Sequence, residues 1–197
     1  MAETIETRPF PPFLPKKATV MMMGTFPPEQ SKRAMEFHYP NFQNDMWRVF
    51  GFVFFDEKDH FRNGEEKAMD PEKIKAFLSE AGIASCPTVL KAIREKGNAS
   101  DAFLKVVEPV PLADVLEQIP DCKHIGTTGG KATEILLSLL PEKVKLPKTG
   151  ETIPFVFNGR ELTLTRLPST SRAYPLSLPK KAEAYKNFFK ACGLKTK

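Results

Sequence analysis

The chain has 197 residues, of which 41% are hydrophobic and 27% charged, and its formal net charge is +5. This composition is typical of a globular protein with a sizeable core, and no apolar run approaches the roughly 18 residues that a membrane span needs. The mildly basic balance suits a polyanion such as nucleic acid, although many basic proteins bind none. Residues 1–15 lack the apolar core of a secretory signal. We therefore expect a cytoplasmic protein, nucleoid-associated if bacterial, that does not bind membranes.

Cysteine and histidine spacing gives no sign of a metal site or a disulfide framework. The cysteines form no Cys-x-x-Cys pair; they are Cys86, Cys122 and Cys192. The histidines lack His-x-His and His-x-x-x-His spacing; they are His38, His60 and His124. We expect buried or idle thiols in a reducing compartment, histidines that are surface or core residues, and no metal or other cofactor.

The first part of the chain predicts an extended segment followed by a buried strand. Four prolines make residues 1–17 an extended lead-in. Residues 18–23 are a nearly continuous apolar run that ends at Gly24, which favours a strand buried on both faces. Prolines make the next twenty residues mostly loop, with a helical stretch near 30–36. Helical spacing resumes over 44–52.

The clearest helix signal lies at residues 71–81. Asp70 is placed to cap its first turn, Pro71 fits the first helical position, and Gly82 ends it. A short strand and turn are expected over 83–90. The remaining expected elements are, in order, a charged stretch 91–96 ended by Gly97, a short helix 112–118, a strand 124–128, a helix 131–140, a hairpin of 155–157 and 162–167 with an Asn158-Gly159 turn, and an amphipathic helix 179–192 closed by Gly193.

Strands alternate with helices through much of the chain, which predicts a three-layer α/β/α sandwich with a central, mostly parallel sheet. We expect one domain over 1–197, with 1–17 as lead-in and 194–197 as a basic tail. Ligand sites of such sheets lie beyond the carboxyl ends of the strands. Two loops qualify, one after Met23 and one after Leu167.

Two further patterns were weighed as sites of chemistry. Gly126-Thr-Thr-Gly-Gly-Lys-Ala132 is similar to a phosphate loop, but Ile125 stands where that motif needs its first Gly and Ala132 where it needs Ser or Thr. A strand-to-helix turn is the better interpretation, though its amides could contact a phosphate. Residues 169–171 offer hydroxyls without a nucleophile elbow, so they fit hydrogen bonds to a DNA phosphate or a base better than covalent catalysis.

The loop after Met23 is rich in aromatic and amide side chains. They are Phe37, His38, Tyr39, Asn41, Phe42, Gln43, Asn44 and Trp47. A base flipped out of DNA needs a flat stacking partner and groups that read its edge, and this set supplies both. The same aromatic residues could equally be core.

Two segments resemble the motifs of the uracil-DNA glycosylase superfamily. Gly24-Thr-Phe-Pro-Pro28 followed about twenty residues later by Asn44-Asp-Met-Trp-Arg-Val49 resembles its first motif, and Leu167-Pro-Ser-Thr-Ser171 resembles its second. The second motif is most similar to that of the hypoxanthine-DNA glycosylase branch. The likeness extends over roughly residues 18–190. It implies a fold of that type and a monofunctional base-excision repair enzyme that flips uracil or hypoxanthine out of single- or double-stranded DNA and hydrolyses its N-glycosidic bond.

The resemblance also implies roles for residues of the first motif. Asn44 matches the catalytic asparagine, which would fix the base, the water or both. Gly24 and the backbone amides of Thr25 and Phe26 would bind the base, on which Tyr39 would stack. Many members have Asn or Asp where this chain has Phe26, which cannot orient water; the hypoxanthine branch also lacks that polar residue.

In the second motif, the resemblance implies DNA contacts by Ser169, Thr170 and Ser171, and a wedge into the vacated stack among Arg172, Ala173 and Tyr174. Neither loop motif offers a lysine for a Schiff base, which implies a hydrolase without lyase activity. The chain is expected to act as a monomer.

The chain departs from the branch in three places. Asn41-Phe42 replaces a His-Pro pair, Met46 replaces Phe, and Arg172 stands where Pro is frequent, so the base preference stays open. Two alternatives also remain. One is a catalytically inactive nucleic-acid-binding protein of the same fold, which the Phe26 position favours. The other is an unrelated α/β hydrolase or nucleotide-processing enzyme.

Overall fold

The structure, a computed structural model, describes residues 2–95 and 101–197. Its central sheet has five strands in the order β3-β2-β6-β8-β7. The first four are parallel, and β7 pairs antiparallel with β8 at one edge. In that spatial order the strands are β3 (Ile83–Ser85), β2 (Val20–Met23), β6 (His124–Thr128), β8 (Arg160–Leu167) and β7 (Thr152–Phe157).

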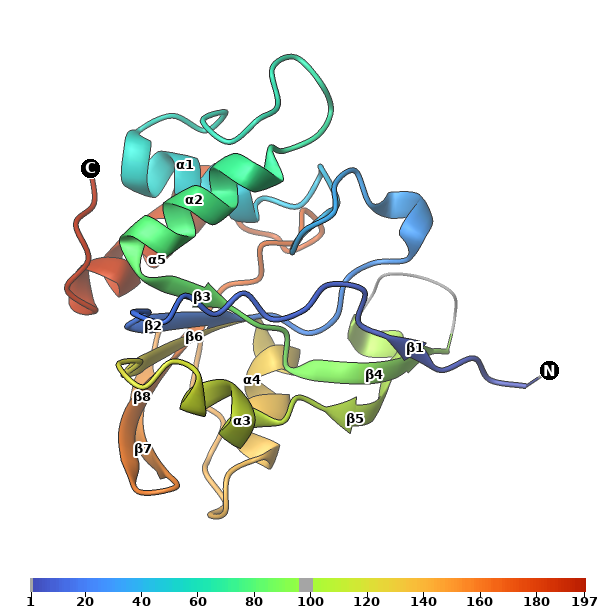
Figure 1. Cartoon of the computed structure of the whole chain (residues 1–197), viewed down its shortest axis with the longest axis vertical. Coiled ribbons are helices and arrows are strands. Elements are labelled where there is room, and N and C mark those ends of the chain that lie inside the picture. Colours follow the sequence, from blue (N-terminus) through green and yellow to red (C-terminus); the bar gives the residue numbers. More distant parts are fainter. Residues whose placement is uncertain (1, 96–100) are drawn as a thin grey trace.

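Helices cover both faces of this sheet (Figure 1). One face carries α1 (Met46–Phe55), α2 (Pro71–Ala81) and α5 (Leu178–Ala191), and the other carries α3 (Leu112–Glu117) and α4 (Gly130–Ser138). The three-layer sandwich with a mostly parallel sheet is therefore confirmed. Within the described residues, no helix combines the length and the apolarity that crossing a membrane requires.

The buried strand β2 explains how one short run of sequence serves two cores. Its side chains alternate between the faces of the sheet, as the pleat of a strand dictates. Val20 and Met22 pack in the cluster beneath α1, α2 and α5, while Met21 and Met23 pack in the cluster of α3 and α4. Both sets are buried, which is why the run is apolar throughout instead of alternating.

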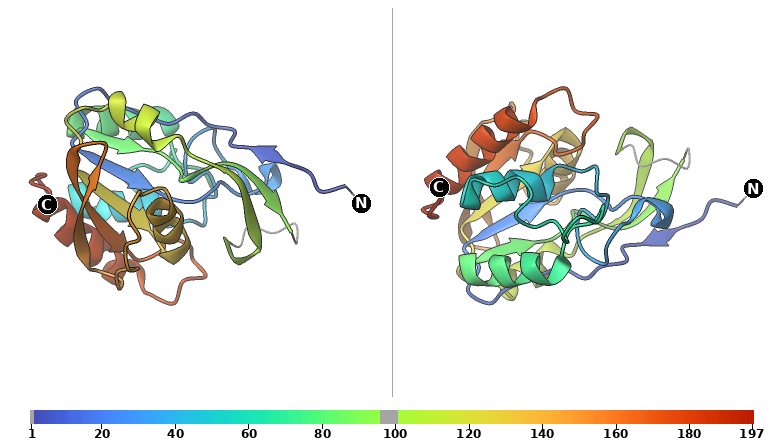
Figure 2. Two further views of the ribbon diagram at one scale, coloured as in Figure 1. Left: turned by 90° about the horizontal axis from the view of Figure 1, so that it is seen from below. Right: turned by 90° about the horizontal axis from the view of Figure 1, so that it is seen from above.

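A second, antiparallel sheet lies beside the first, near the N-terminus (Figure 2), and the sequence did not predict it. Its strands are, in spatial order, β1 (Glu6–Thr7), β4 (Val89–Arg94) and β5 (Leu104–Pro109), with the 3-10 turn η2 (Asp101–Phe103) before β5. The expected charged stretch 91–96 is thus largely strand; Lys96 and Gly97 lie outside the described residues. Two residues of β4 form ion pairs with its neighbours: Lys91 lies 3.1 Å from Glu108 of β5, and Arg94 lies 2.7 Å from Glu6 of β1.

The predicted ends of helix α2 and the predicted hairpin turn are confirmed. The Asp70 carboxylate accepts hydrogen bonds from the backbone N–H groups of Glu72 and Lys73, and Gly82 ends α2 with a left-handed φ of 75°. The hairpin turn at Asn158 and Gly159 has φ values of 48° and 78°. The helical stretch expected near 30–36 is wrong, because only the single 3-10 turn η1 (Gln30–Lys32) forms there.

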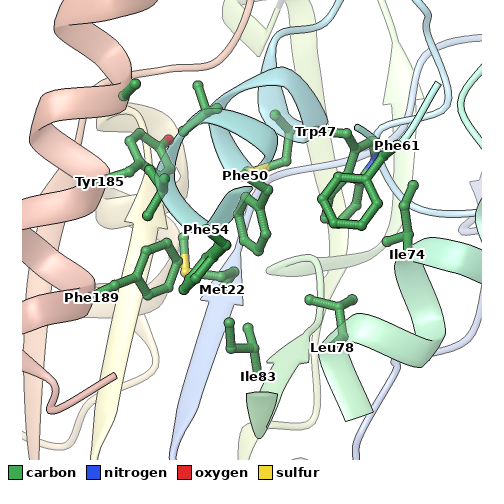
Figure 3. Close-up of a cluster of buried hydrophobic side chains, with 14 of the residues drawn as sticks. Met22, Trp47, Phe50, Phe54, Phe61, Ile74, Leu78, Ile83, Tyr185 and Phe189 are labelled. Carbon is green, nitrogen blue, oxygen red and sulfur yellow. The ribbon is translucent and has the colours of Figure 1, made fainter. Parts of the chain in front are cut away.

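The core under α1, α2 and α5 is largely aromatic (Figure 3). Phe50 contacts Trp47 edge-on with ring centroids 5.1 Å apart, and it meets Phe189 of α5 at 5.3 Å. Phe61 and Phe77 close the cluster on the side of α2, 5.5 Å apart. Since aromatic pairs contribute beyond their buried area, this layer holds α1 rigidly against the sheet. The start of α1 carries residues of the first expected motif, so its position determines theirs.

Candidate functional site

A cavity of about 570 Å³ opens at the carboxyl ends of the four parallel strands. Each strand contributes the residues at or just beyond its end: Ser85 for β3, Gly24 for β2, Thr128 for β6 and Ser169 for β8. Parallel strands end at the same edge, so segments far apart in the sequence meet there. The volume lies within the range of small-ligand pockets.

Ten of the eleven residues to which the resemblance assigns roles line this cavity. They are Gly24, Thr25, Phe26, Tyr39, Asn44, Ser169, Thr170, Ser171, Arg172 and Ala173. Tyr174 is half-buried and outside the cavity wall, while its neighbour Ala173 lines it. Thr170 is only 2% exposed, so its hydroxyl is less open to solvent than those of its two serine neighbours.

Tyr39 and Gly24 fit closely against each other at the end of β2. The Tyr39 hydroxyl lies 3.2 Å from the Thr128 hydroxyl, and its ring packs edge-on against Trp47 at 6.0 Å. A Cβ at position 24 would stand 2.6 Å from the Tyr39 oxygen, so glycine is what lets the tyrosine hydroxyl keep this position. Tyr39 itself has a left-handed φ of 53°, a rare conformation for an aromatic residue. The tyrosine ring is therefore held in the cavity wall by specific contacts.

Phe26 joins the cavity to the small antiparallel sheet. It packs with the apolar cluster of Val89 and Leu104, and the Arg94 guanidinium lies 5.4 Å from its ring centroid. Arg94 also donates a hydrogen bond to the Pro27 carbonyl. The turn after β2 is thereby anchored through its aromatic side chain, which explains structurally why a large apolar residue stands at this position.

Asn44 uses one end of its amide to start helix α1. Its Oδ1 accepts a hydrogen bond of 2.9 Å from the Met46 backbone N–H, one of the donors that a helix start leaves unpaired. No acceptor in the described part of the chain bonds to its Nδ2 group. Because Asn44 lines the cavity and is only partly buried, the Nδ2 hydrogens are the donors it retains for a ligand.

A buried ion pair that the sequence did not predict joins the two motif loops. Lys181 of α5 is 1% exposed, and its Nζ donates to Asp45 Oδ2 at 3.1 Å and to the Ser171 carbonyl at 2.9 Å. The Asp45 backbone N–H donates to the Thr170 carbonyl at 2.9 Å. Arg172 adds a contact of 3.2 Å to Asp45 Oδ1. The segment around Asn44 and the segment 169–172 are thus tied together by charge and backbone contacts.

The hydroxyls of the second loop shape its backbone. Ser169 Oγ accepts from the Ser171 backbone N–H at 3.1 Å, and Ser171 Oγ accepts from that of Ala173 at 3.3 Å. The buried Tyr185 hydroxyl donates to the Pro168 carbonyl at 2.7 Å. Each serine still has its own hydroxyl hydrogen to donate, which suits an anionic partner such as a phosphate oxygen.

The opposite wall is polar, and of its residues only His38 belongs to a loop that the sequence singled out. His38 and Ser85 lie there, with His38 Nδ1 2.7 Å from Ser85 Oγ, and the neighbouring Cys86 has a pKa that burial raises to about 12. Arg8 and Phe10 of the expected lead-in also line this wall. The strand-end rule that selected two loops would have found Ser85 and Thr128 had it been applied to all four parallel strands. Lys32 of η1 lines the cavity as well, so this site includes a lysine outside the two motifs.

Metal ligands do not gather around this cavity in the described ranges. Across residues 2–95 and 101–197, no three side chains of His, Cys, Asp or Glu are grouped as they would be around an ion. The cavity instead offers hydroxyls, backbone amides, the Asn44 amide and the Tyr39 ring, which recognise a planar polar ligand by hydrogen bonds and stacking.

Comparison with known proteins identifies the fold. No family model and no curated protein matches the sequence. Among solved structures, the chain is similar to the solution NMR structure of a "putative uracil DNA glycosylase" from Methanosarcina acetivorans. The TM-score is 0.64 and the sequence identity 21%, and the match covers 96% of this chain and 99% of that one. At this identity the likeness establishes a shared fold.

Proposed function

We propose that this protein is a monofunctional DNA glycosylase that flips a deaminated base, uracil or hypoxanthine, into the cavity and hydrolyses its N-glycosidic bond. One observation carries the proposal: Tyr39 and Asn44 line one cavity at the strand ends together with the loop 169–171, which lies far from them in the sequence. A flipped base needs a stacking surface, donors for its edge and a grip on the flanking backbone, and these three supply them. The shared fold with the archaeal protein supports the same interpretation.

Asn44 is proposed to act as a hydrogen-bond donor to the departing base. Cleavage of an N-glycosidic bond leaves negative charge on the base, and preorganised donors stabilise such charge. Since Oδ1 of Asn44 is engaged by the Met46 N–H, its Nδ2 group is the end directed to this role. The backbone amides of Thr25 and Phe26 would bond a base carbonyl oxygen in the same way, while Tyr39 stacks on the ring.

The DNA backbone is proposed to lie along the second loop. Ser169 and Ser171 would donate to phosphate oxygens, and Arg172 would contribute its charge, since its side chain is 55% exposed. Phosphate contacts release counterions, so binding should weaken steeply with salt. The protein would act in the cytoplasm as a monomeric single domain, without a cofactor.

The test uses oligonucleotides that carry a single uracil or hypoxanthine, incubated with the protein in EDTA and then cut by hot alkali at abasic sites. We expect cleavage of at least one of them. Asn44→Ala should slow single-turnover excision by about 10²- to 10³-fold, as loss of a preorganised donor does, while binding of an abasic analogue changes little. Asn187→Ala, an exposed position on α5 outside this cavity, is the matched control. A normal excision rate in Asn44→Ala would overturn the assigned role.

The same assay tests the absence of lyase chemistry. Borohydride reduction during the reaction should trap no covalent protein–DNA product, because the proposal involves no Schiff base. A trapped adduct that disappears in Lys32→Ala would contradict the monofunctional assignment, since Lys32 lines the cavity.

The packing of Phe26 favours one second candidate, a DNA-binding protein without catalysis. The Phe26 ring is engaged with the small sheet and has no group that could orient water. This candidate predicts tight binding of uracil-containing DNA with no alkali-labile site at any protein concentration.

A further inference from the structure

A buried polar pair, His38 and Ser85, lies in the cavity wall at the end of β3. His38 is 6% exposed and Ser85 is 3% exposed, and both line the cavity. His38 Nδ1 lies 2.7 Å from Ser85 Oγ, and His38 Nε2 lies 2.8 Å from the Pro11 carbonyl oxygen. The ring is stacked on Phe37 with the two planes 3° apart, so its orientation is determined.

The Pro11 carbonyl determines which nitrogen of His38 carries hydrogen. A carbonyl oxygen can only accept, so Nε2 must be the donor of that bond. Burial, together with the positive charges of Arg8 and Lys75, lowers the pKa of His38 to about 4, and the ring is therefore neutral near pH 7. In a neutral ring with hydrogen on Nε2, Nδ1 is an acceptor. The Ser85 hydroxyl consequently donates its single hydrogen to His38.

Because its hydrogen is used, the Ser85 oxygen can only accept a hydrogen bond from any further partner. In the described part of the chain, His38 is the one group that hydrogen-bonds to that oxygen, and it does so as acceptor of the hydroxyl hydrogen. A hydroxyl normally adapts as donor or acceptor by rotating, but here its hydrogen is committed. The low basicity of His38 also argues against a nucleophilic serine, because a base with a pKa near 4 removes a hydroxyl proton poorly. Ser85 is thus a fixed acceptor in the wall of the cavity.

A fixed acceptor separates deaminated bases from their parents. Cytosine and adenine present a bare ring nitrogen on their pairing edge, whereas uracil and hypoxanthine carry an N–H at the same position. Given the proposed glycosylase function, we propose that Ser85, with its hydroxyl hydrogen held by His38, accepts a hydrogen bond from this ring N–H and rejects the lone pair of the undamaged base. Ser85 is then a specificity-determining residue, and His38 is the positioning residue that makes Ser85 an acceptor and not a donor.

The test measures binding, so that it does not depend on catalysis. Oligonucleotides carry a 2′-fluoro nucleotide of uracil or cytosine, which resists bond cleavage, opposite an abasic analogue so that neither base is paired. Each affinity is divided by that for DNA with an abasic analogue in place of the base, which cancels general changes in DNA binding. We expect the wild-type protein to favour uracil by at least about 10-fold, the scale of one well-placed hydrogen bond.

The two variants should reduce this preference from opposite sides. Ser85→Ala removes the acceptor, so uracil should bind about 10-fold more weakly. His38→Phe keeps the stacking on Phe37 but frees the Ser85 hydrogen, so cytosine should bind more tightly. Thr163→Val is the matched control, because Thr163 Oγ1 makes the same 2.7 Å contact with His124 Nδ1 away from this cavity. Melting temperatures verify that each variant is folded.

The outcomes separate this inference from the proposed function. A preference for uracil that persists in Ser85→Ala overturns the inference, even if the protein excises uracil normally. Equal binding of the two bases by the wild-type protein overturns it as well. A Ser85-dependent preference in a protein that leaves deoxyuridine uncut supports the recognition mechanism while the glycosylase proposal fails.

Discussion

The two helical layers of this protein are built from different chemistry. The layer of α1, α2 and α5 buries eight aromatic side chains, and it includes the buried charges of Asp45, Arg48 and Lys181. The layer of α3 and α4 buries aliphatic side chains with Phe155 as its single buried aromatic, and no buried charge is found in the described part of its helices. The layer with the costly buried charges is the one that holds the cavity loops. We infer that the first layer is shaped by the site, and the second by stability.

The largest effect that tests this difference between the two layers is expected from the buried ion pair of Asp45 and Lys181. Lys181→Ala leaves the Asp45 carboxylate buried without its closest cationic partner, which should lower the free energy of unfolding by about 4 kcal/mol. Chemical denaturation measures this loss, and the proposed base excision should fall too, because the two motif loops are no longer tied together. Lys180→Ala, the exposed neighbour, is the control and should change stability by less than about 0.5 kcal/mol.

A double variant refines that prediction. Lys181→Met combined with Asp45→Asn removes both ions of the pair but also takes away the carboxylate 3.7 Å from the buried Arg48, so only part of the stability should return. Stability that does not recover at all would mean that the unpaired Arg48 and the lost packing of the lysine stem outweigh the relief of the Asp45 charge.

The aliphatic layer should respond differently to a core truncation. Leu136 of α4 is fully buried, and Leu136→Ala should cost about 3 kcal/mol through the cavity it creates. Thermal or urea unfolding measures this cost. Excision per folded molecule should stay unchanged, and a loss of activity beyond the loss of folded protein would show that the layers are not separable.

The buried histidine predicts how stability changes with pH. The pKa of His38 is lowered from 6.5 to about 4 in the folded protein, so the unfolded chain binds more protons between these values. Stability should therefore fall as the pH drops from 7, with His38 contributing about 2 kcal/mol of the loss by pH 5. Denaturation curves at pH 7 and pH 5 should show a smaller loss in His38→Phe than in the wild type. Equal losses in both proteins would mean that folding does not lower the pKa of His38.

The smallest expected effect concerns the only helix among those described whose N-cap side chain accepts a hydrogen bond. Asp70→Ala removes the cap of α2 and should cost about 1 kcal/mol, because two backbone N–H groups lose their acceptor. Asp121→Ala, at an exposed position outside a helix, is the control for loss of a carboxylate. A melting temperature in Asp70→Ala equal to that of the control would show that α2 is held by packing alone.

Sequence signals that depend on neighbouring residues predicted the fold well. The Asp70 cap, the Gly82 end, the Asn158-Gly159 turn and the unbroken apolar run of β2 are local, and each is confirmed. The pairing of β4 with β5 was not predicted, because charged residues in these strands gain their partners only across the sheet. For the same reason the sequence does not reveal that Lys181 is buried against Asp45.

Motifs and strand ends in the sequence indicate which loops meet at the candidate site, but not how their side chains contact one another. These two arguments found the residues of two loops, and the cavity contains nearly all of them. They did not reveal the polarity of Ser85 or the tie between Asp45 and Lys181, because both depend on side chains that meet only after folding.

The Asp45–Lys181 pair also affects the order in which the protein can mature during its synthesis. The two partners are 136 residues apart, so Asp45 leaves the ribosome long before Lys181 has been made. At roughly 5–20 residues per second, the interval is on the order of ten seconds. Throughout it, Asp45 lacks Lys181 and Arg172, and of its three cationic partners only Arg48 has been made. The cavity is therefore completed late, because the loop 169–172 and α5 are made last among its parts.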